Sequence, residues 1–155
     1  MMCNCKCVND DKELSMKIKL LDSNATIPSR QTDGSAGFDL YSSQAASVSS
    51  GCTFKIRTGI ALQIPEGYVG LIFARSGLAT KKGLRPANCV GVIDSDYRGE
   101  IIVALHNDSS DYADIKIGDR IAQLVIVPYV SPILILSDKL DETIRGSGGF
   151  GSTGT

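Results

Sequence analysis

The sequence has no tryptophan, few aromatic residues (6%) and a single histidine, His106. A Ser-His-Asp triad would have to use that histidine, and no G-x-S-x-G turn is present to supply its nucleophile. The H-x-E and P-C-x-x-C pattern of zinc nucleobase deaminases is also absent. A single-stranded nucleic-acid binder of the OB type needs basic, aromatic strands, which this composition disfavours. We expect His106 to lie in a solvated loop.

The chain also lacks an excess of either charge. Its 16 basic and 17 acidic residues give a net charge of −1, so no overall field attracts it to nucleic acid or to an anionic membrane. The longest apolar stretch, 124–136, is interrupted by prolines and too short to span a bilayer. Residues 1–15 lack the apolar core of a signal peptide. These features predict a soluble cytoplasmic protein with neither nucleic acid nor membrane as a partner.

The five cysteines do not indicate a disulfide framework, because their number is odd and no secretory signal precedes them. Cys3, Cys5 and Cys7 form a C-x-C-x-C run that could bind a soft metal. The run has no matching second cluster, so the sequence favours a flexible, reduced tail over residues 1–15.

Short apolar segments between turn residues dominate the rest of the chain, which is long enough for one domain. Apolar and basic residues alternate over 16–20, as they do in a half-buried strand. Further strands are expected at 54–56, 59–64, 68–73, 89–93, 101–105 and 120–127, between turns containing Gly, Pro, Asn or Asp. This spacing predicts an all-β fold: a sandwich, a jelly roll or a barrel.

One segment, Ser76–Lys82, has the pattern of a short helix. Ser76 is expected to be its N-cap, two lysines fall in its last turn, and Gly83 ends it. Arg75, Ser76 and Gly77 would then offer donors at the start of the helix, where anions bind. A capped helix with a surface arginine explains the same residues equally well.

The segment from Asn88 to Glu100 predicts a β-hairpin, with apolar residues leading into and out of a polar turn. Asp94 lies where strand meets turn, which is a rigid position for a general base. Tyr97 is near enough to stack on a sugar or a base. A turn alone accounts for the other polar residues of the segment.

Two polar residues, Asp39 and Gln123, stand inside apolar segments. A buried polar group without partners costs about 1–3 kcal/mol, so each must pair with its neighbours or face a polar cleft. For Gln123 the sequence leaves both explanations open. For Asp39 it favours a structural role over direct metal ligation.

The C-terminal residues 145–155 include five glycines and cannot form a fold of their own. Their composition favours a disordered end. Arg145, Phe150, Ser152 and Thr153 nevertheless offer a phosphate donor, a stacking ring and two hydroxyls. Ordering of this tail on a ligand would reconcile the two interpretations.

In order along the chain, these segments resemble the trimeric deoxyuridine triphosphatase (dUTPase) family. The resemblance extends from about Ile18 to Thr155 and includes five family motifs, at 36–42, 74–79, 91–100, 118–124 and 145–153. It implies a jelly-roll (β-clip) subunit with one short helix, assembling as a homotrimer with active sites between subunits. The expected parts are a flexible cysteine-containing tail (1–15), the jelly-roll domain (16–140) and a glycine-rich arm (141–155) that closes over a neighbouring subunit's site.

The resemblance also implies hydrolysis of dUTP to dUMP and pyrophosphate by attack of water on the α-phosphorus, which keeps uracil out of DNA and supplies dUMP for thymidylate synthesis. Asp94 would deprotonate the water, and Asp39 would support the site. Mg²⁺ would be held mainly by substrate phosphates and water, with no direct protein ligand. The implied substrate-binding residues are Arg75, Ser76, Gly77, Asn88, Gly91, Val92, Tyr97, Ile102, Gln123, Arg145, Phe150, Gly151, Ser152 and Thr153.

Two other functions stay open at this point. A dCTP deaminase shares the jelly roll but uses a glutamate base and a different arginine-serine motif, so the Asp94–Tyr97 turn and the complete tail favour a dUTPase. A binding or signalling module on the same scaffold is the second; complete motifs argue against loss of catalysis but not against an added role. The cysteine tail departs from the family pattern, as does Ala74, where many relatives carry proline.

Overall fold

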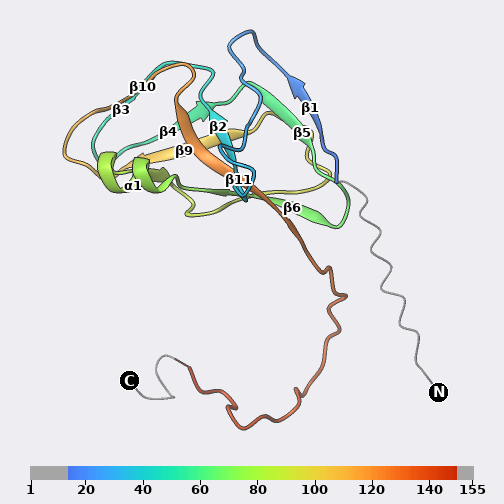
Figure 1. Cartoon of the computed structure of the whole chain (residues 1–155). Helices are drawn as coiled ribbons and strands as arrows, with labels where there is room; N and C mark the ends of the chain where they lie inside the picture. Colours follow the sequence, from blue (N-terminus) through green and yellow to red (C-terminus); the bar gives the residue numbers. More distant parts are fainter. Residues whose placement is uncertain (1–13, 150–155) are drawn as a thin grey trace.

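Antiparallel strands and one short helix make up the regular structure of residues 14–149, the part of the chain that this computed structural model describes (Figure 1). The elements in chain order are β1 (Lys17–Leu20), β2 (Phe38–Tyr41), β3 (Ala46–Val48), β4 (Thr53–Arg57), β5 (Ile60–Gln63), β6 (Tyr68–Phe73), α1 (Ser76–Lys82), β7 (Leu84–Pro86), β8 (Gly91–Ile93), β9 (Ile102–Asn107), β10 (Ala113–Ile115) and β11 (Arg120–Pro128). The mostly β class that the sequence predicts is therefore confirmed.

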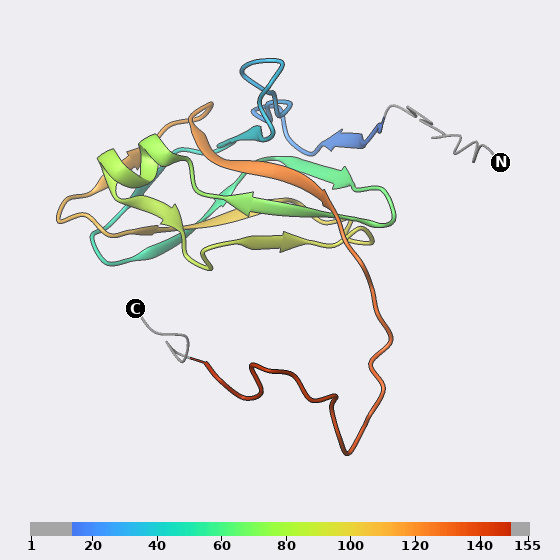
Figure 2. The same ribbon diagram turned by 60° about the horizontal axis from the view of Figure 1, so that its bottom comes forward.

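The strands of the described residues form four small sheets. The largest has the order β2-β11-β6-β8, and a three-stranded sheet has the order β4-β9-β7. Two further pairs, β1-β5 and β10-β3, complete the arrangement. Figure 2 shows the strands in layers, with α1 at one end of the molecule.

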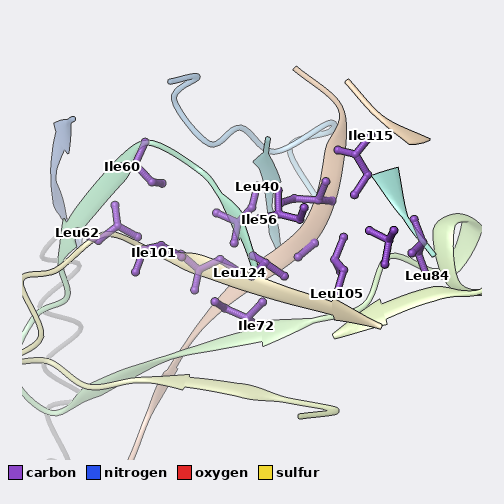
Figure 3. Packing of buried hydrophobic residues seen from close by; sticks show 14 of the residues in the cluster. Leu40, Ile56, Ile60, Leu62, Ile72, Leu84, Ile101, Leu105, Ile115 and Leu124 are labelled. Carbon is purple, nitrogen blue, oxygen red and sulfur yellow. The ribbon is translucent and has the colours of Figure 1, made fainter. Parts of the chain in front are cut away.

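The core lies between these layers and is built from branched aliphatic side chains of several sheets (Figure 3). Leu40 of β2, Ile56 of β4, Leu105 of β9 and Leu124 of β11 are all fully buried. Each contributes about 1.5–3 kcal/mol relative to an exposed side chain. Gly70 of β6 fits here because a Cβ atom would lie 2.7 Å from Ile64 Cδ1. The core therefore fixes the sheet that carries much of the candidate site.

Most predicted strands occur close to their expected places, including β6 at its expected bounds. Strands β2, β3, β7 and β10 are absent from the predicted set. The last three have three residues each with a polar residue in the middle, so they form no apolar run. In β2 the buried Asp39 also interrupts the apolar pattern.

The prediction that residues 88–100 form a β-hairpin is wrong, because the two strands that flank this segment do not pair with each other. β8 pairs with β6, whereas β9 pairs with β4 and β7, so the two flanks belong to different sheets. The apolar flanks were recognised correctly, but each meets its hydrogen-bond partners elsewhere in the chain. Residues 94–101 therefore cross from one sheet to the other.

The expectation of a loop histidine is also wrong, because His106 belongs to β9. Its Nδ1 lies 3.0 Å from Thr53 Oγ1, and its Nε2 lies 3.4 Å from Asp108 Oδ1. Asp108 in turn accepts two hydrogen bonds from Arg85, which raise the pKa of that guanidinium. The histidine is thus a member of a polar cluster on the three-stranded sheet.

The helix α1 covers the predicted residues, but its N-cap is Arg75 and not Ser76. Arg75 is extended (φ −84°, ψ 126°), and Ser76 is already helical, with its carbonyl accepting a hydrogen bond from Thr80 Oγ1. Gly83 ends the helix in the left-handed conformation (φ 65°), as expected of glycine at this position.

No helix within residues 14–149 has the length and apolarity needed to cross a membrane.

After β11 the chain leaves the body of the molecule as an extended segment (Figure 1). Its apolar side chains are almost fully exposed, with relative accessibilities of 85–98% for the run from Ile133 to Leu136. The predicted cysteine tail lies almost wholly in residues 1–13, outside the described residues. The division into tail, domain and arm remains a prediction.

Asn107 offers a test of the packing, because its fully buried side chain makes four hydrogen bonds. Its Nδ2 donates to the carbonyls of Val48 and Asp111 at 2.8 Å, and its Oδ1 accepts from the amide and the hydroxyl of Ser109. Asn107→Ala removes all four bonds and leaves the Val48 carbonyl and the Ser109 amide without this partner, while the Ser109 hydroxyl still donates to the Asp111 carbonyl. We expect a loss of about 3 kcal/mol in the free energy of unfolding. Urea denaturation at fixed protein concentration measures it. Asn24→Ala, at an exposed position, is the control, and an equal loss in both variants would contradict the assignment.

Candidate active site

The carboxylate of Asp39 is the centre of a buried polar cluster. Asp39 is 1% exposed, and its Oδ1 accepts a hydrogen bond from Arg75 Nε at 2.9 Å. Gln123 Nε2 donates to the same oxygen at 3.4 Å, and Arg120 Nη1 donates to Oδ2 at 3.4 Å. The cluster therefore joins β2, β11 and the N-cap residue of α1.

A bulge in β11 brings the two β11 residues to the same carboxylate. Gln123 lies directly opposite Asp39, and Arg120 lies opposite Tyr41, two residues further along β2. In a regular strand, residues three apart point to opposite faces. The register shift between Arg120 and Ala122 adds the extra residue that turns both side chains to the same face of the sheet.

This bulge explains why sequence analysis missed Arg120. The alternation of a regular strand places it on the face opposite Gln123, so it is not a candidate partner of Asp39. The signal that could have found it is Gly118-Asp119-Arg120, a turn followed by a charged residue at the start of an otherwise apolar strand. For Gln123, the structure answers the question that the sequence left open, because its amide faces the polar cluster.

A basic cleft opens beside the Asp39 cluster. It has a volume of about 360 Å³, and its lining includes Arg75, Gly77, Lys81, Lys82 and Arg120. Asp114 and Asp119 also contribute to the wall, so four basic residues face two acidic ones. Cations gathered in one cleft favour a polyanionic ligand even though the whole chain is nearly neutral.

At the start of α1, the main chain at Gly77 has free space beside it. A Cβ atom built on Gly77 would meet no atom of the described residues within 4 Å. Ser76 is exposed beside it. Of the predicted anion-binding residues, Arg75 and Gly77 therefore line this cleft, and Ser76 lies between them in the chain.

A second, smaller pocket of about 170 Å³ lies where residues 94–101 leave β8 and return to β9. Its lining is Val92, Ile93, Asp94, Tyr97, Glu100 and Ile102. The Asp94 carboxylate is exposed at this pocket. The loop is held by a turn, in which the Tyr97 amide donates to the Asp94 carbonyl, and by Arg98, which donates to the carbonyls of Ser95 and Tyr97.

Asn88 and Gly91 lie in the turn that precedes this pocket and at the start of β8. Gly91 packs against β6, where a Cβ atom would lie 3.2 Å from Ile72 Cβ. Asn88 Nδ2 lies 3.6 Å from the same Cβ position, so the two predicted base-binding residues are neighbours. Neither is among the residues that line the pocket of Asp94.

The structure thus gathers the predicted site residues into two groups and does not join them. Asp39, Arg75 and Gln123 meet in the buried cluster, from which Arg75 also lines the basic cleft, and Asp94 and Tyr97 meet at the smaller pocket. Arg145 lies in the extended C-terminal segment, where its Nε donates to the Gly148 carbonyl. The predicted residues Phe150, Gly151, Ser152 and Thr153 lie outside the described residues.

Carboxylates do not gather as a metal-ligand set in the part of the chain that the structure describes. No group of three or more His, Cys, Asp and Glu side chains is close enough there to hold an ion. The buried Asp39 carboxylate is already bonded to two arginines and an amide. A divalent ion at the basic cleft would thus need oxygen ligands from elsewhere.

Comparison of the sequence with known proteins gives a consistent result. The dUTPase family model matches residues 23–154. A deoxyuridine 5'-triphosphate nucleotidohydrolase of Desulfitobacterium hafniense is 50% identical over 147 residues, which cover 90% of this chain and 97% of that protein.

Solved structures of dUTPases are also similar to this chain. The dUTPase of Staphylococcus bacteriophage 80alpha with dUPNHPP has a TM-score of 0.81 at 32% identity, covering 91% of this chain and 99% of the other. A mutant dUTPase from phage phi11 of S. aureus, described with a coordinated structural Mg(II) ion, has a TM-score of 0.75 at 29% identity and covers 81% and 98%. The family match includes every motif from residue 36 to residue 153, and the chain therefore belongs to the dUTPase family.

Proposed function

We propose that this chain hydrolyses dUTP to dUMP and pyrophosphate. The observation that carries the proposal is the family match over residues 23–154, supported by 50% identity to a deoxyuridine 5'-triphosphate nucleotidohydrolase over nearly its whole length. The basic cleft and the Asp94 pocket supply the two kinds of surface that a nucleoside triphosphate needs. The reaction would remove dUTP before it enters DNA and supply dUMP for thymidylate synthesis.

The triphosphate binds in the basic cleft. Arg75 uses its Nε to hold Asp39 and its Nη1 for the Arg120 carbonyl, and about a quarter of its side chain stays exposed. Asp39 neutralises only one of the two guanidinium charges, so Arg75 and Arg120 together keep a net positive charge for phosphate oxygens. Gly77 admits the phosphates close to the backbone, and Ser76 and Gln123 add donors.

The nucleoside binds beside residues 94–101. Tyr97 packs under the deoxyribose and leaves no room for a 2′-hydroxyl, while Val92 and Ile102 form the apolar wall. Asn88 and the backbone near Gly91 pair with the edge of uracil. Backbone donors and acceptors distinguish uracil from cytosine, because the wrong base would leave buried polar groups without partners.

Asp94 acts as the general base. Its exposed carboxylate takes a proton from the attacking water, whose oxygen forms a bond to the α-phosphorus as the bond to the pyrophosphate oxygen breaks. Arg75 and Arg120 stabilise the charge that develops on the phosphates. Mg²⁺ fits here as an ion held by substrate phosphates and water, since Asp39 is engaged by its own partners; it would offset phosphate charge.

Each active site combines surfaces of different copies in a homotrimer of jelly-roll subunits. The basic cleft and the Asp94 pocket have no lining residue in common within one chain. Val92 and Ile102, beside Asp94, are 60% and 44% exposed in the single chain. Neighbouring exposed apolar side chains are typical of a surface that binds another chain or a ligand. The arm at 141–155 closes over a neighbour, with Phe150 on uracil and Arg145, Gly151, Ser152 and Thr153 on the phosphates.

Pyrophosphate release from dUTP, dCTP, dTTP and UTP in parallel, with Mg²⁺, tests the function. We expect release from dUTP alone, because the pocket distinguishes both the base and the sugar. Ammonia release from dCTP would assign the chain to the deaminase branch instead. No turnover of any nucleotide would reject the proposed reaction and leave a nucleotide-binding module.

Asp94→Asn should lower kcat by about 100- to 10,000-fold while dUTP still binds, because the amide keeps the shape of the carboxylate but takes no proton. Rapid-quench turnover and calorimetric titration with the dUTP analogue dUPNHPP measure the two quantities. Asp33→Asn, at an exposed position away from both pockets, is the control. Native turnover by the Asp94 variant would refute its role as base.

Refolding an equal mixture of Asp94→Asn and Arg75→Ala chains tests whether each active site is shared between subunits. If Asp94 and Arg75 come from different copies, about a quarter of the sites in random trimers receive both native residues, and activity returns to that extent. If both residues come from one chain, every site keeps a defect. Activity of the mixture no higher than that of the separate variants would therefore contradict a shared site.

A further inference from the structure

Glu100 ends the loop that carries Asp94 and Tyr97, and its carboxylate is anchored outside that loop. Arg57 Nε, on β4, donates to both carboxylate oxygens at 3.2 and 3.1 Å. The Gly59 amide donates to Oε1 at 2.9 Å. The Glu100 side chain is only 16% exposed, so these donors replace most of its hydration.

The groups that hold Glu100 are themselves fixed. Arg57 Nη2 lies 3.6 Å from Asp22 Oδ2, so two carboxylates share its guanidinium. Gly59 has a positive φ of 68°, and a Cβ atom there would lie 2.8 Å from Ala25 Cβ and 3.0 Å from Asp22 Oδ2. Only glycine therefore fits at position 59, where the backbone packs against the segment of Asp22 and Ala25.

The main chain of Glu100 determines the orientation of Tyr97. The Tyr97 hydroxyl donates to the Glu100 carbonyl at 3.0 Å. The phenol ring lies against Gly99, where any Cβ atom would collide with the Tyr97 ring and hydroxyl. A shift of the Glu100 peptide would thus move the ring that faces the pocket of about 170 Å³.

We propose that Glu100 is a positioning residue for sugar selectivity. Arg57 and the Gly59 amide hold its carboxylate, its carbonyl then holds the Tyr97 hydroxyl, and the fixed ring rejects a 2′-hydroxyl. The proposal rests on the proposed function, in which Tyr97 packs under the deoxyribose. Rejection of an added group requires a rigid wall, and this chain of contacts supplies the rigidity.

Glu100→Gln in the full-length protein tests the proposal. The amide keeps the size of the side chain but loses its charge and one acceptor, so Arg57 and Gly59 are no longer both satisfied. We expect the ratio of kcat/KM for dUTP over UTP to fall by about tenfold. Glu66→Gln, at an exposed position outside the pockets described above, is the matched control and should leave the ratio unchanged.

The ratio separates positioning from a general loss of folded enzyme, because misfolding lowers turnover of both nucleotides equally. Arg57→Gln should lower it as well, and the double variant should be no worse than either single one, since the pair acts as a unit. An unchanged ratio in Glu100→Gln with dUTP turnover retained would overturn the proposal and leave the proposed function intact.

Amide hydrogen exchange of residues 94–101 in the nucleotide-free protein gives a readout that does not depend on turnover. We expect faster exchange at Tyr97 and at the Gly59 amide in Glu100→Gln than in Glu66→Gln. If the amide exchange rates at Tyr97 and Gly59 in both variants equal those of the native protein, the proposal is overturned, whatever reaction the enzyme catalyses. Absence of dUTP hydrolysis by the native chain would instead reject the proposed function and with it the sugar selectivity, whereas the exchange rates would still show whether Glu100 holds Tyr97.

Discussion

The contact between the buried Asp39 carboxylate and two arginines organises much of this protein. Asp39 lies on β2, whereas its partners come from the start of α1 and from β11. An ionised carboxylate is buried only where charged and polar donors compensate its lost hydration. Arg75 and Arg120, in turn, can stand side by side only because a negative charge lies between them. The same contact thus ties β2 to β11 and to the start of α1, and it places two positive charges together beside the largest sheet.

The two halves of the candidate site are built differently. The anion-binding half stands on strands and on a helix start, where backbone hydrogen bonds fix the side chains. The half that contains Asp94 and Tyr97 stands on a loop between sheets, and side-chain contacts replace the missing ladder. Triphosphates are alike in all nucleotides, whereas base and sugar differ, so under the proposed function discrimination would depend mainly on the second half.

The sequence predicted the β class, the helix and most long strands because each has a local signature. Gly83, for example, ends α1 in a conformation that glycine adopts without strain. What it could not predict arises from non-local pairing. The flanks of residues 94–101 look like a hairpin, yet each pairs with a distant strand. Ser76 has the chemistry of an N-cap, yet the extended residue is Arg75.

Local pattern singled out candidate site residues one by one, but it did not predict which of them meet. Asp39, Arg75 and Gln123 are far apart in sequence, and only the fold brings them together. Arg120 was missed because a bulge changes which face it points to, and no rule of alternation anticipates an added residue. Glu100 was included in a motif without a role, since its partners Arg57 and Gly59 lie some 40 positions earlier.

The run from Ile133 to Leu136 has a consequence for handling the protein. Four consecutive branched aliphatic residues, almost fully exposed and without charge, have the composition of segments that self-associate through β-pairing. The single chain therefore exposes an apolar extended segment that lies outside its strands. If the proposed homotrimer covers this run, separating its subunits should lower colloidal solubility as well as assembly, so that yield, turbidity and quaternary structure vary together.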